Sequence, residues 1–265
     1  MNRMQLFEFE DFRCFPTTMR DYVTDFLQFM VHNFYTYEDL TPVLLRGLHA
    51  SKTTQIVDIA SGGGGGWQRL AQQLKKKEPA LRIVLTDLYP NHVAFAAISG
   101  ESRGIIRSID TPIDAQHIPH DLVGLRTQFL SFHHFRPKHA TAILQNAVDA
   151  RAPIVIVEIQ RRSPKDLMKN FFSPIAVLLA TPFIRPFRGG RLFFTYIIPI
   201  LPVVVWWDGI ASVLRTYNEN ELRGMIDSLE NGDTYTWETG QTPSTSAPVY
   251  YLAGYPEEVR QKSDR

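Results

Sequence analysis

The spacing of hydrophobic positions changes along the chain and predicts which segments form helices and which form strands. Residues 4–50 have apolar side chains near helical spacing, so we expect two or three helices there. Short apolar runs alternating with helical stretches then follow, and the strand runs lie at 54–60, 81–87, 104–119, 126–135 and 152–160. Strands that are apolar along most of their length and alternate with helices are typical of a parallel sheet covered on both faces.

The C-terminal part departs from this alternation. Residues 161–216 are rich in proline and aromatic side chains, which predicts an apolar cap insertion. A helix at 218–229 and two closely spaced strands, 234–240 and 248–256, follow it. The predicted fold is an α/β, Rossmann-like doubly wound sheet, mostly parallel with an antiparallel last strand, with N-terminal helices and the cap added.

Composition excludes several classes of partner. Lys plus Arg is 28 and Asp plus Glu is 27, so the net charge of +1 gives no general attraction to nucleic acid, and we expect none as a partner. Cys14 is the only cysteine, which excludes an internal disulfide and a Cys-rich metal site. Acidic residues interrupt the apolar stretch that a signal peptide needs near the N-terminus, so we expect a cytoplasmic protein.

The longest apolar run, residues 192–207, contains Pro199 and Pro202. It is shorter than the roughly 20 residues that a membrane-spanning helix needs, and the prolines interrupt helical hydrogen bonding. We therefore expect no spanning segment. Peripheral contact of the apolar cap with a membrane or with lipid stays open.

Five consecutive glycines, residues 62–66, follow the first strand and precede a helix. Such a turn brings backbone N–H groups and a helix N-terminus against a ligand. The G-x-G-x-x-G pattern of dinucleotide sites fails in every frame, because its last position falls on Trp67, Gln68 or Arg69. The P-loop pattern fails as well, because no Lys-Ser/Thr pair follows Gly66.

A different pattern, D-x-G-x-G-x-G, does fit the turn, with Ala60 in place of the first glycine. With it, acidic residues at the ends of the second and third strands give the chain a resemblance to class I S-adenosylmethionine-dependent methyltransferases. The resemblance implies S-adenosylmethionine as cofactor, with an acidic residue on its ribose and another near its adenine. The cofactor-binding positions that it implies are Asp58, Ala60, Ser61, Gly62, Gly64, Asp87, Leu88, Asp114, Ala115 and Ser131.

The end of the fourth strand suggests the chemistry. It reads Ser-Phe-His-His-Phe at 131–135 instead of the Asn/Asp-Pro-Pro-aromatic motif of many nucleobase and protein methyltransferases. The stretch is similar to that of small-molecule O-methyltransferases, which implies His133 as general base. His134 and Phe135 stand where that family has Asp and Trp, so His133 equally fits a role in capping the strand or lining the cofactor pocket.

The remaining polar candidates lie beside the cap. Glu158 ends the fifth strand, where it orients a substrate or a histidine, or bonds the cap. Asp208 and Arg215 are opposite charges in an apolar stretch and suit lid closure or substrate orientation. Three histidines, His133, His134 and His139, lack the i, i+4 spacing of a helical metal motif, and we expect no metal. The predicted substrate-binding residues are His134, Glu158, Trp207 and Arg215.

These observations predict three parts: a helical substrate-gating segment at 1–50, a cofactor-binding core at 51–160 and 217–256, and a cap at 161–216. The predicted function is methyl transfer from S-adenosylmethionine to an O, C or N atom of a small lipophilic or aromatic metabolite, because aromatic residues of the cap suit such a ligand. The alternatives are an RNA or protein methyltransferase and a non-catalytic S-adenosylmethionine-binding partner subunit. The oligomeric state is left open.

Overall fold

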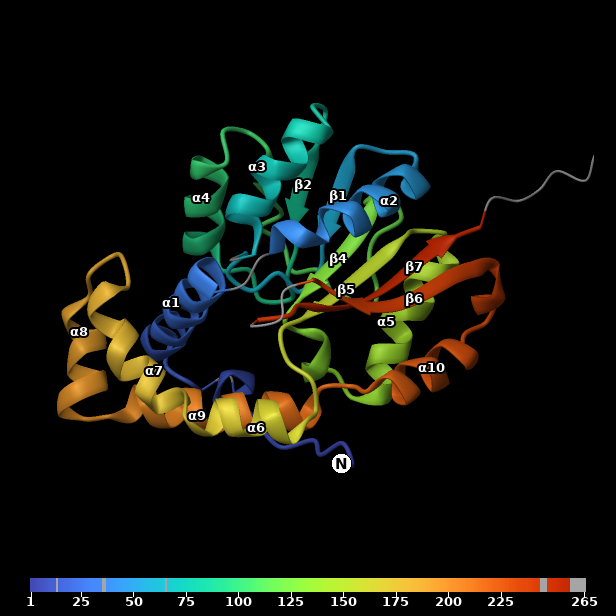
Figure 1. The fold of residues 1–265 in the computed structure, drawn as a ribbon. Coiled ribbons are helices and arrows are strands. Elements are labelled where there is room, and N and C mark those ends of the chain that lie inside the picture. Colours follow the sequence, from blue (N-terminus) through green and yellow to red (C-terminus); the bar gives the residue numbers. More distant parts are fainter. Residues whose placement is uncertain (13, 35–36, 65, 244–246, 258–265) are drawn as a thin grey trace, which may run out of the picture.

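A single twisted sheet forms the centre of the molecule (Figure 1). The computed structural model describes residues 1–12, 14–34, 37–64, 66–243 and 247–257. Seven strands in these residues have the order β3-β2-β1-β4-β5-β7-β6. They are β1 Gln55–Asp58, β2 Arg82–Leu85, β3 Ile106–Ser108, β4 Leu125–Phe129, β5 Ile154–Glu158, β6 Tyr235–Gln241 and β7 Tyr250–Pro256.

Pairing along the sheet confirms the predicted fold class. Strands β1 to β5 pair in parallel, β7 is antiparallel to β5, and β6 is antiparallel to β7. Asp58 at the end of β1 is in register with Leu85 of β2 and Thr127 of β4. The carboxyl ends of the central strands therefore lie level at one edge, and the strand order reverses between β1 and β4, where ligands bind in open α/β sheets.

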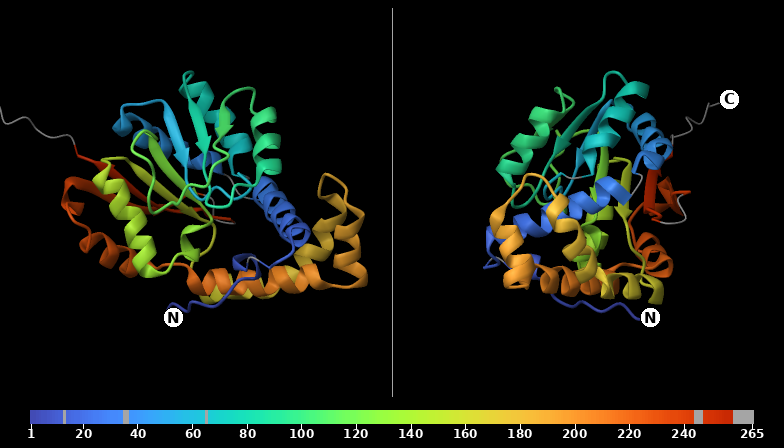
Figure 2. Two further views of the ribbon diagram at one scale, coloured as in Figure 1. Left: turned by 180° about the vertical axis from the view of Figure 1, so that it is seen from behind. Right: turned by 60° about the vertical axis from the view of Figure 1, so that its left-hand side comes forward.

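Helices cover both faces of the sheet (Figures 1 and 2). The buried side chains of α2 Thr41–Ser51, α3 Trp67–Lys77 and α4 His92–Glu101 form one core cluster with the sheet. Those of α5 Pro137–Asp149 and α10 Glu219–Asp227 form another. The predicted apolar stripe of α3 is confirmed, because Trp67, Leu70, Ala71 and Leu74 are all buried.

The cap consists of α6 Pro164–Phe171, α7 Ser173–Ala180, α8 Gly189–Leu192 and α9 Ile200–Arg215. It lies to one side of the sheet, and α1 Thr17–Phe34 runs beside it (Figures 1 and 2). Tyr22 and Phe26 of α1 share a buried cluster with Leu201 and Val205 of α9. Most buried side chains of α1 therefore pack against the cap, whereas those of α2 pack against the sheet.

Short turns complete the chain: η1 Phe9–Asp11, η2 Tyr37–Leu40, η3 Phe132–His134, η4 Thr181–Phe183, the π-turn η5 Phe193–Ile197 and η6 Gly232–Thr234.

The prediction of a helical N-terminus is wrong for the first residues. Apart from the η1 turn, no regular helix precedes Thr17 among the residues described. Backbone bonds to distant elements explain this: the Met4 N–H donates to the Leu214 carbonyl and the Phe9 N–H donates to Asp208. Tertiary contacts thus hold residues 1–8 outside any regular helix, and helix α1 begins directly after Pro16.

The cap exposes a wide apolar surface. Leu179, Phe183, Phe187 and Ile197 are each between 64% and 70% exposed. Among the described residues no single helix is long and apolar enough to cross a membrane; Gly189–Ile197 and Ile200–Arg215 reach that length and hydropathy only as a pair, bent by 80°. Contact of this surface with lipid stays a prediction, which cosedimentation with lipid vesicles would test.

Candidate active site

The turn after β1 has a left-handed backbone conformation at each of the three glycine positions of the D-x-G-x-G-x-G frame. The φ angles are 50° at Ala60, 55° at Gly62 and 69° at Gly64, all in the left-handed region. Glycine adopts this region freely, whereas an L-residue with a Cβ pays about 1–2 kcal/mol. Ala60 therefore keeps the geometry of the missing glycine at an energetic cost.

Close packing accounts for two further glycines of the run. A Cβ on Gly63 would lie 3.0 Å from Thr24 Cγ2 of α1, and one on Gly66 would lie 3.0 Å from Tyr37 Cε2. Helix α1 and the η2 turn therefore approach the loop as closely as glycine permits. Gly65 lies outside the described residues.

Asp58, at the end of β1, is buried beneath this loop. Its side chain is 1% exposed, and Oδ1 accepts a hydrogen bond from the Thr127 hydroxyl at 2.7 Å. Burial raises the pKa of Asp58 to about 6, although the bond from Thr127 favours the charged form. The Ser61 hydroxyl donates to the Asp58 carbonyl at 2.8 Å, so the two residues close the start of the turn.

Asp87 joins the loop to the end of β2. Its Oδ2 accepts the Gly62 N–H and its Oδ1 accepts the Tyr89 N–H, both at 2.8 Å. Strand β2 ends at Leu85, two residues earlier than predicted, so Asp87 stands in the loop and not on the strand. Leu88 beside it is 44% exposed and offers an apolar surface at this edge.

The loop after β3 is tied to the same edge, because the Ile113 N–H donates to the Asp87 carbonyl at 2.9 Å. Partial burial opposes ionisation of Asp114, but bonds from the Gln116 N–H and from His117 outweigh it and hold its pKa below the usual range. Two predicted cofactor positions complete this edge: Ala115 is buried, and Ser131, just after β4, bonds Gln128 at 3.1 Å.

Glu158, at the end of β5, holds His133 in place. Its two oxygens each lie 3.0 Å from His133 Nδ1, and Oε1 also accepts the His133 backbone N–H at 3.1 Å. His133 is 3% exposed. Among the contacts considered for Glu158, a substrate, a histidine or the cap, the structure shows the contact with a histidine. Because carboxylate oxygens only accept, this arrangement favours a proton on Nδ1. Nε2 lies 3.8 Å from Glu8 Oε1.

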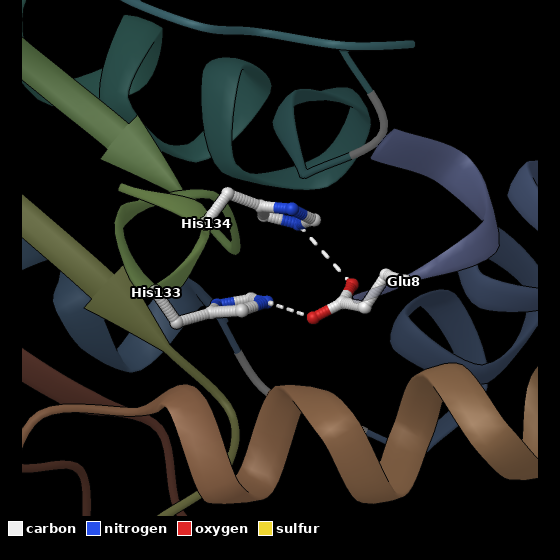
Figure 3. Close-up of side chains that lie close together, drawn as sticks. All are labelled: Glu8, His133 and His134. Atoms are coloured by element: carbon white, nitrogen blue, oxygen red, sulfur yellow. Dashed lines mark ion pairs between the residues drawn. The ribbon is translucent and has the colours of Figure 1, made fainter. Parts of the chain in front are cut away.

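His134 is held in a similar way by the N-terminal segment. Its Nδ1 lies 2.9 Å from Asp11 Oδ1, and its Nε2 lies 3.5 Å from Glu8 Oε2 (Figure 3). Burial lowers the pKa of His134, but the charges of Glu8 and Asp11 outweigh this and raise it to about 9. The two imidazole rings lie 4.4 Å apart between centroids.

Arg215 binds the same segment, which we call the N-terminal strap (residues 3–11). Its Nη1 lies 3.0 Å from Glu8 Oε1 and 2.7 Å from Asp11 Oδ2. Arg3 extends the contact by donating to the carbonyls of His133 and Phe135 at 3.2 and 3.0 Å. The predicted substrate residue Arg215 therefore anchors the strap.

Helix α9 provides two more anchors. Trp207, another predicted substrate residue, donates from Nε1 to the Phe7 carbonyl at 2.9 Å, with the two ring centroids 5.0 Å apart. Asp208 Oδ1 accepts the Phe9 N–H at 2.8 Å. Asp208 and Arg215 thus each bind the strap.

Sequence reasoning missed Arg3, Glu8 and Asp11. The signal available for the two acids was their place among phenylalanines in the stretch Phe-Glu-Phe-Glu-Asp-Phe, residues 7–12. Charges interleaved with large apolar side chains suggest that some of those charges are buried and paired. Glu8 is 2% exposed.

A cavity of about 310 Å³ opens beside Glu158. Its wall includes Gln160 and Arg161 after β5, Tyr217 before α10, and Tyr251 of β7. The edge of the sheet that carries the glycine loop and the histidines thus also has a space of ligand size, with aromatic and polar walls.

No family model and no curated protein sequence matches the chain. Solved structures with a similar fold do match the chain. Several of the matched structures are methyltransferases. Human N-acetylserotonin methyltransferase in complex with S-adenosylmethionine is 11% identical, with a TM-score of 0.48 over 91% of this chain and 57% of that one. The mitomycin 7-O-methyltransferase MmcR is 15% identical, with a TM-score of 0.45 over 94% and 70%.

An O-methyltransferase family protein from Burkholderia thailandensis is 11% identical, with a TM-score of 0.44 over 84% of this chain and 59% of that one. The chain spans little more than half the length of some of the matched proteins. At these identities the likeness concerns the fold.

Proposed function

We propose that the chain transfers a methyl group from S-adenosylmethionine to a small, lipophilic or aromatic metabolite. One observation carries the proposal. The Asp87 carboxylate lies against the Gly62 N–H in the glycine loop, and the buried His133–Glu158 pair follows at the same carboxyl edge of the sheet. A cofactor site and an acceptor site therefore adjoin.

The residues of the loop fit the cofactor. A Cβ on Gly62 would meet no atom within 4 Å, so the backbone there faces open space in which the methionine part fits. Each Asp87 oxygen accepts one backbone N–H and has a lone pair left for a ribose hydroxyl. The exposed side chain of Leu88 suits one face of the adenine. When bound, the cofactor supplies the electrophilic methyl group.

The histidine pair fits the acceptor side. Methyl transfer is an in-line displacement, so the protein has to position the acceptor, exclude water and remove a proton where the acceptor is a hydroxyl. Glu158 binds Nδ1 of the His133 ring and leaves Nε2, which lies 3.8 Å from Glu8 Oε1, as the ring nitrogen available on the acceptor side. The strap and the cap keep bulk water away from the His133 ring, because this residue is 3% exposed. The general-base role of His133 stays a prediction.

Labelled S-adenosylmethionine tests the activity. We expect the purified protein to transfer labelled methyl groups to a small-molecule fraction of a metabolite extract of the source organism. Label in the RNA or protein fraction would favour those acceptors instead. Tight cofactor binding with no labelled product in any fraction would favour a non-catalytic subunit and contradict the proposal.

Asp87→Ala tests the cofactor site separately. We expect the affinity for S-adenosylmethionine to fall about 5- to 150-fold, because losing a charge-assisted acceptor costs about 1–3 kcal/mol. Asp121→Ala is the control, since this exposed carboxylate lies before β4, at the opposite edge of the sheet. Equal affinities for Asp87→Ala and wild type, measured by calorimetry, would contradict the cofactor assignment.

A further inference from the structure

Three ligating groups converge at the end of β4. The Nε2 atoms of His133 and His134 and the carboxylate of Glu8 offer ligand atoms within 4.8 Å of one another. Figure 3 shows both rings pointing at the two oxygens of Glu8. The sequence hides this group, because 125 residues separate Glu8 from His133 (133 − 8). His139, the third histidine of the set that its spacing argued against as a metal site, bonds Gln116 at 2.7 Å.

The spacing of these atoms is too wide for hydrogen bonds. His133 Nε2 lies 3.8 Å from Glu8 Oε1, and His134 Nε2 lies 3.5 Å from Glu8 Oε2. Glu8 is 2% exposed, and Oε1 accepts no hydrogen bond from any described residue, although Arg215 Nη1 lies 3.0 Å away. Ligands held about 2.0–2.1 Å from a tetrahedral ion lie roughly 3.3 Å apart, close to the observed gaps.

The outer contacts of both rings are those of metal-binding histidines. Glu158 holds Nδ1 of His133, and Asp11 holds Nδ1 of His134. A carboxylate on the far nitrogen fixes the tautomer and aims the free nitrogen at an ion. Both imidazoles are thus oriented to offer Nε2 to the same point.

We propose that Glu8, His133 and His134 bind one divalent transition-metal ion of the Zn²⁺ type. Two imidazoles and one carboxylate suit Zn²⁺ or Co²⁺ and do not suit Mg²⁺, which prefers oxygen ligands. Three protein ligands leave a coordination position open, as in catalytic zinc sites. The ion also ties the strap to the end of β4.

The role of the ion in catalysis rests on the proposed function, whereas its binding does not. An acceptor hydroxyl at the open position would have its pKa lowered by the ion. His133 Nε2 would then be a ligand and not the general base. The acceptor oxygen would form a bond to the methyl carbon as the bond from that carbon to the sulfur of S-adenosylmethionine breaks, and the hydroxyl proton would pass to a water molecule. Metal binding and methyl transfer can therefore be measured independently.

The experiment uses the full chain stripped of metal with a chelator. We expect calorimetry and elemental analysis to give one Zn²⁺ per chain, and Co²⁺ to give the visible absorption of a four- or five-coordinate site. Mg²⁺ should not compete. Glu8→Gln and His134→Gln should each weaken Zn²⁺ binding at least tenfold, whereas the control His139→Gln should bind like wild type.

Failure to bind Zn²⁺ and Co²⁺ in the stripped wild-type protein would overturn the proposal, and so would unchanged affinity in both variants. If the stripped wild-type protein binds neither Zn²⁺ nor Co²⁺, the contact between Glu8 and His134 is an ion pair with a protonated histidine. Circular dichroism shows whether each variant is folded, and the wild-type Co²⁺ spectrum tests the site even if a variant is not. A wild-type protein that binds Zn²⁺ without methyl transfer would contradict the proposed function and leave the metal site in place.

Discussion

The glycine loop and the histidine cluster lie at the same edge of the sheet but are assembled in different ways. The loop is one continuous segment after β1, and its shape is set by backbone angles at Ala60, Gly62 and Gly64. The cluster joins Glu8 of the strap, the histidines after β4, Glu158 of β5 and Arg215 of α9. Local sequence therefore encodes the first site, whereas only the tertiary fold creates the second.

The two sites also differ in what stabilises them. The loop depends on backbone hydrogen bonds and small residues, so single changes there should have modest effects on folding. The cluster contains buried charges, each of which is tolerated because its partner is present. Changes there should have larger effects on both stability and activity.

The largest effect is expected for Glu158→Gln. The amide can donate to His133 Nδ1, which would place the ring proton on Nε2, the nitrogen that faces Glu8, and leave no lone pair there for a proton or an ion. Wrong orientation or tautomer of a catalytic histidine costs about 10²–10⁴ in rate. We expect kcat for methyl transfer to fall by at least 100-fold with little change in KM for S-adenosylmethionine.

A matched control is Glu238→Gln. Glu238 lies on the edge strand β6, and its carboxylate pairs with Arg46 of α2 at the surface. It should leave kcat unchanged. If Glu158→Gln raised KM for the cofactor and spared kcat, Glu158 would act on cofactor binding and the cluster would not be a distinct acceptor site.

Arg215→Met should destabilise the protein strongly. Arg215 and Glu8 are 3% and 2% exposed, and the change removes the guanidinium that lies 3.0 Å from the buried Glu8 carboxylate. Such changes cost about 3–5 kcal/mol. Urea unfolding with a chelator present measures the loss without compensation by an ion, and limited proteolysis should show earlier cleavage in the strap.

Arg223→Met is the comparison, because Arg223 pairs with Glu219 on the exposed surface of α10. Exposed pairs contribute at most about 1 kcal/mol. Similar losses for the two variants would mean that the strap is not held by buried charge.

The same contrast explains which parts of the fold and of the site could be predicted from the sequence alone. Strand runs and the glycine frame are local patterns, and they predicted the sheet and the edge pair. They placed Asp87 and Asp114 at strand ends, whereas the two residues lie in loops, two residues beyond β2 and six beyond β3. The strap was wrongly predicted as helix, because bonds such as that from Phe9 to Asp208 connect residues 199 apart in sequence. Glu8 could not be assigned for the same reason, since its partners belong to η3 and α9.

Asp58 gives the loop a measurable pH dependence. Its pKa is raised from 3.8 to about 6 in the folded chain, so the folded state binds more protons than the unfolded state between these values. The free energy of unfolding therefore falls as pH rises from 4 to 7, by at most about 3 kcal/mol from this group. Asp58→Asn should remove this dependence, so the variant gains stability relative to wild type across that range.

Chemical unfolding from pH 4 to 8 measures the difference between the two proteins. Loss of the Thr127 bond shifts the whole difference curve by a constant and leaves its slope unaffected. Asp121→Asn, at an exposed position, is the control variant for the same measurement. A flat difference curve for Asp58→Asn would mean that Asp58 is not buried beneath the loop.

The smallest effects are expected from the frame positions themselves. Ala60→Gly removes the strain of a left-handed alanine, but glycine loses more backbone entropy on folding, so a gain of no more than about 1 kcal/mol is expected. Gly64→Ala should destabilise more than Gly62→Ala, because its Cβ would also lie 3.0 Å from Leu85 Cδ1. Gly62→Ala adds a methyl group to open space, so it should weaken S-adenosylmethionine binding more than it lowers stability. The order Ala60→Gly, wild type, Gly62→Ala, Gly64→Ala in decreasing stability would fix the register of the loop; any gain from Gly64→Ala would contradict it.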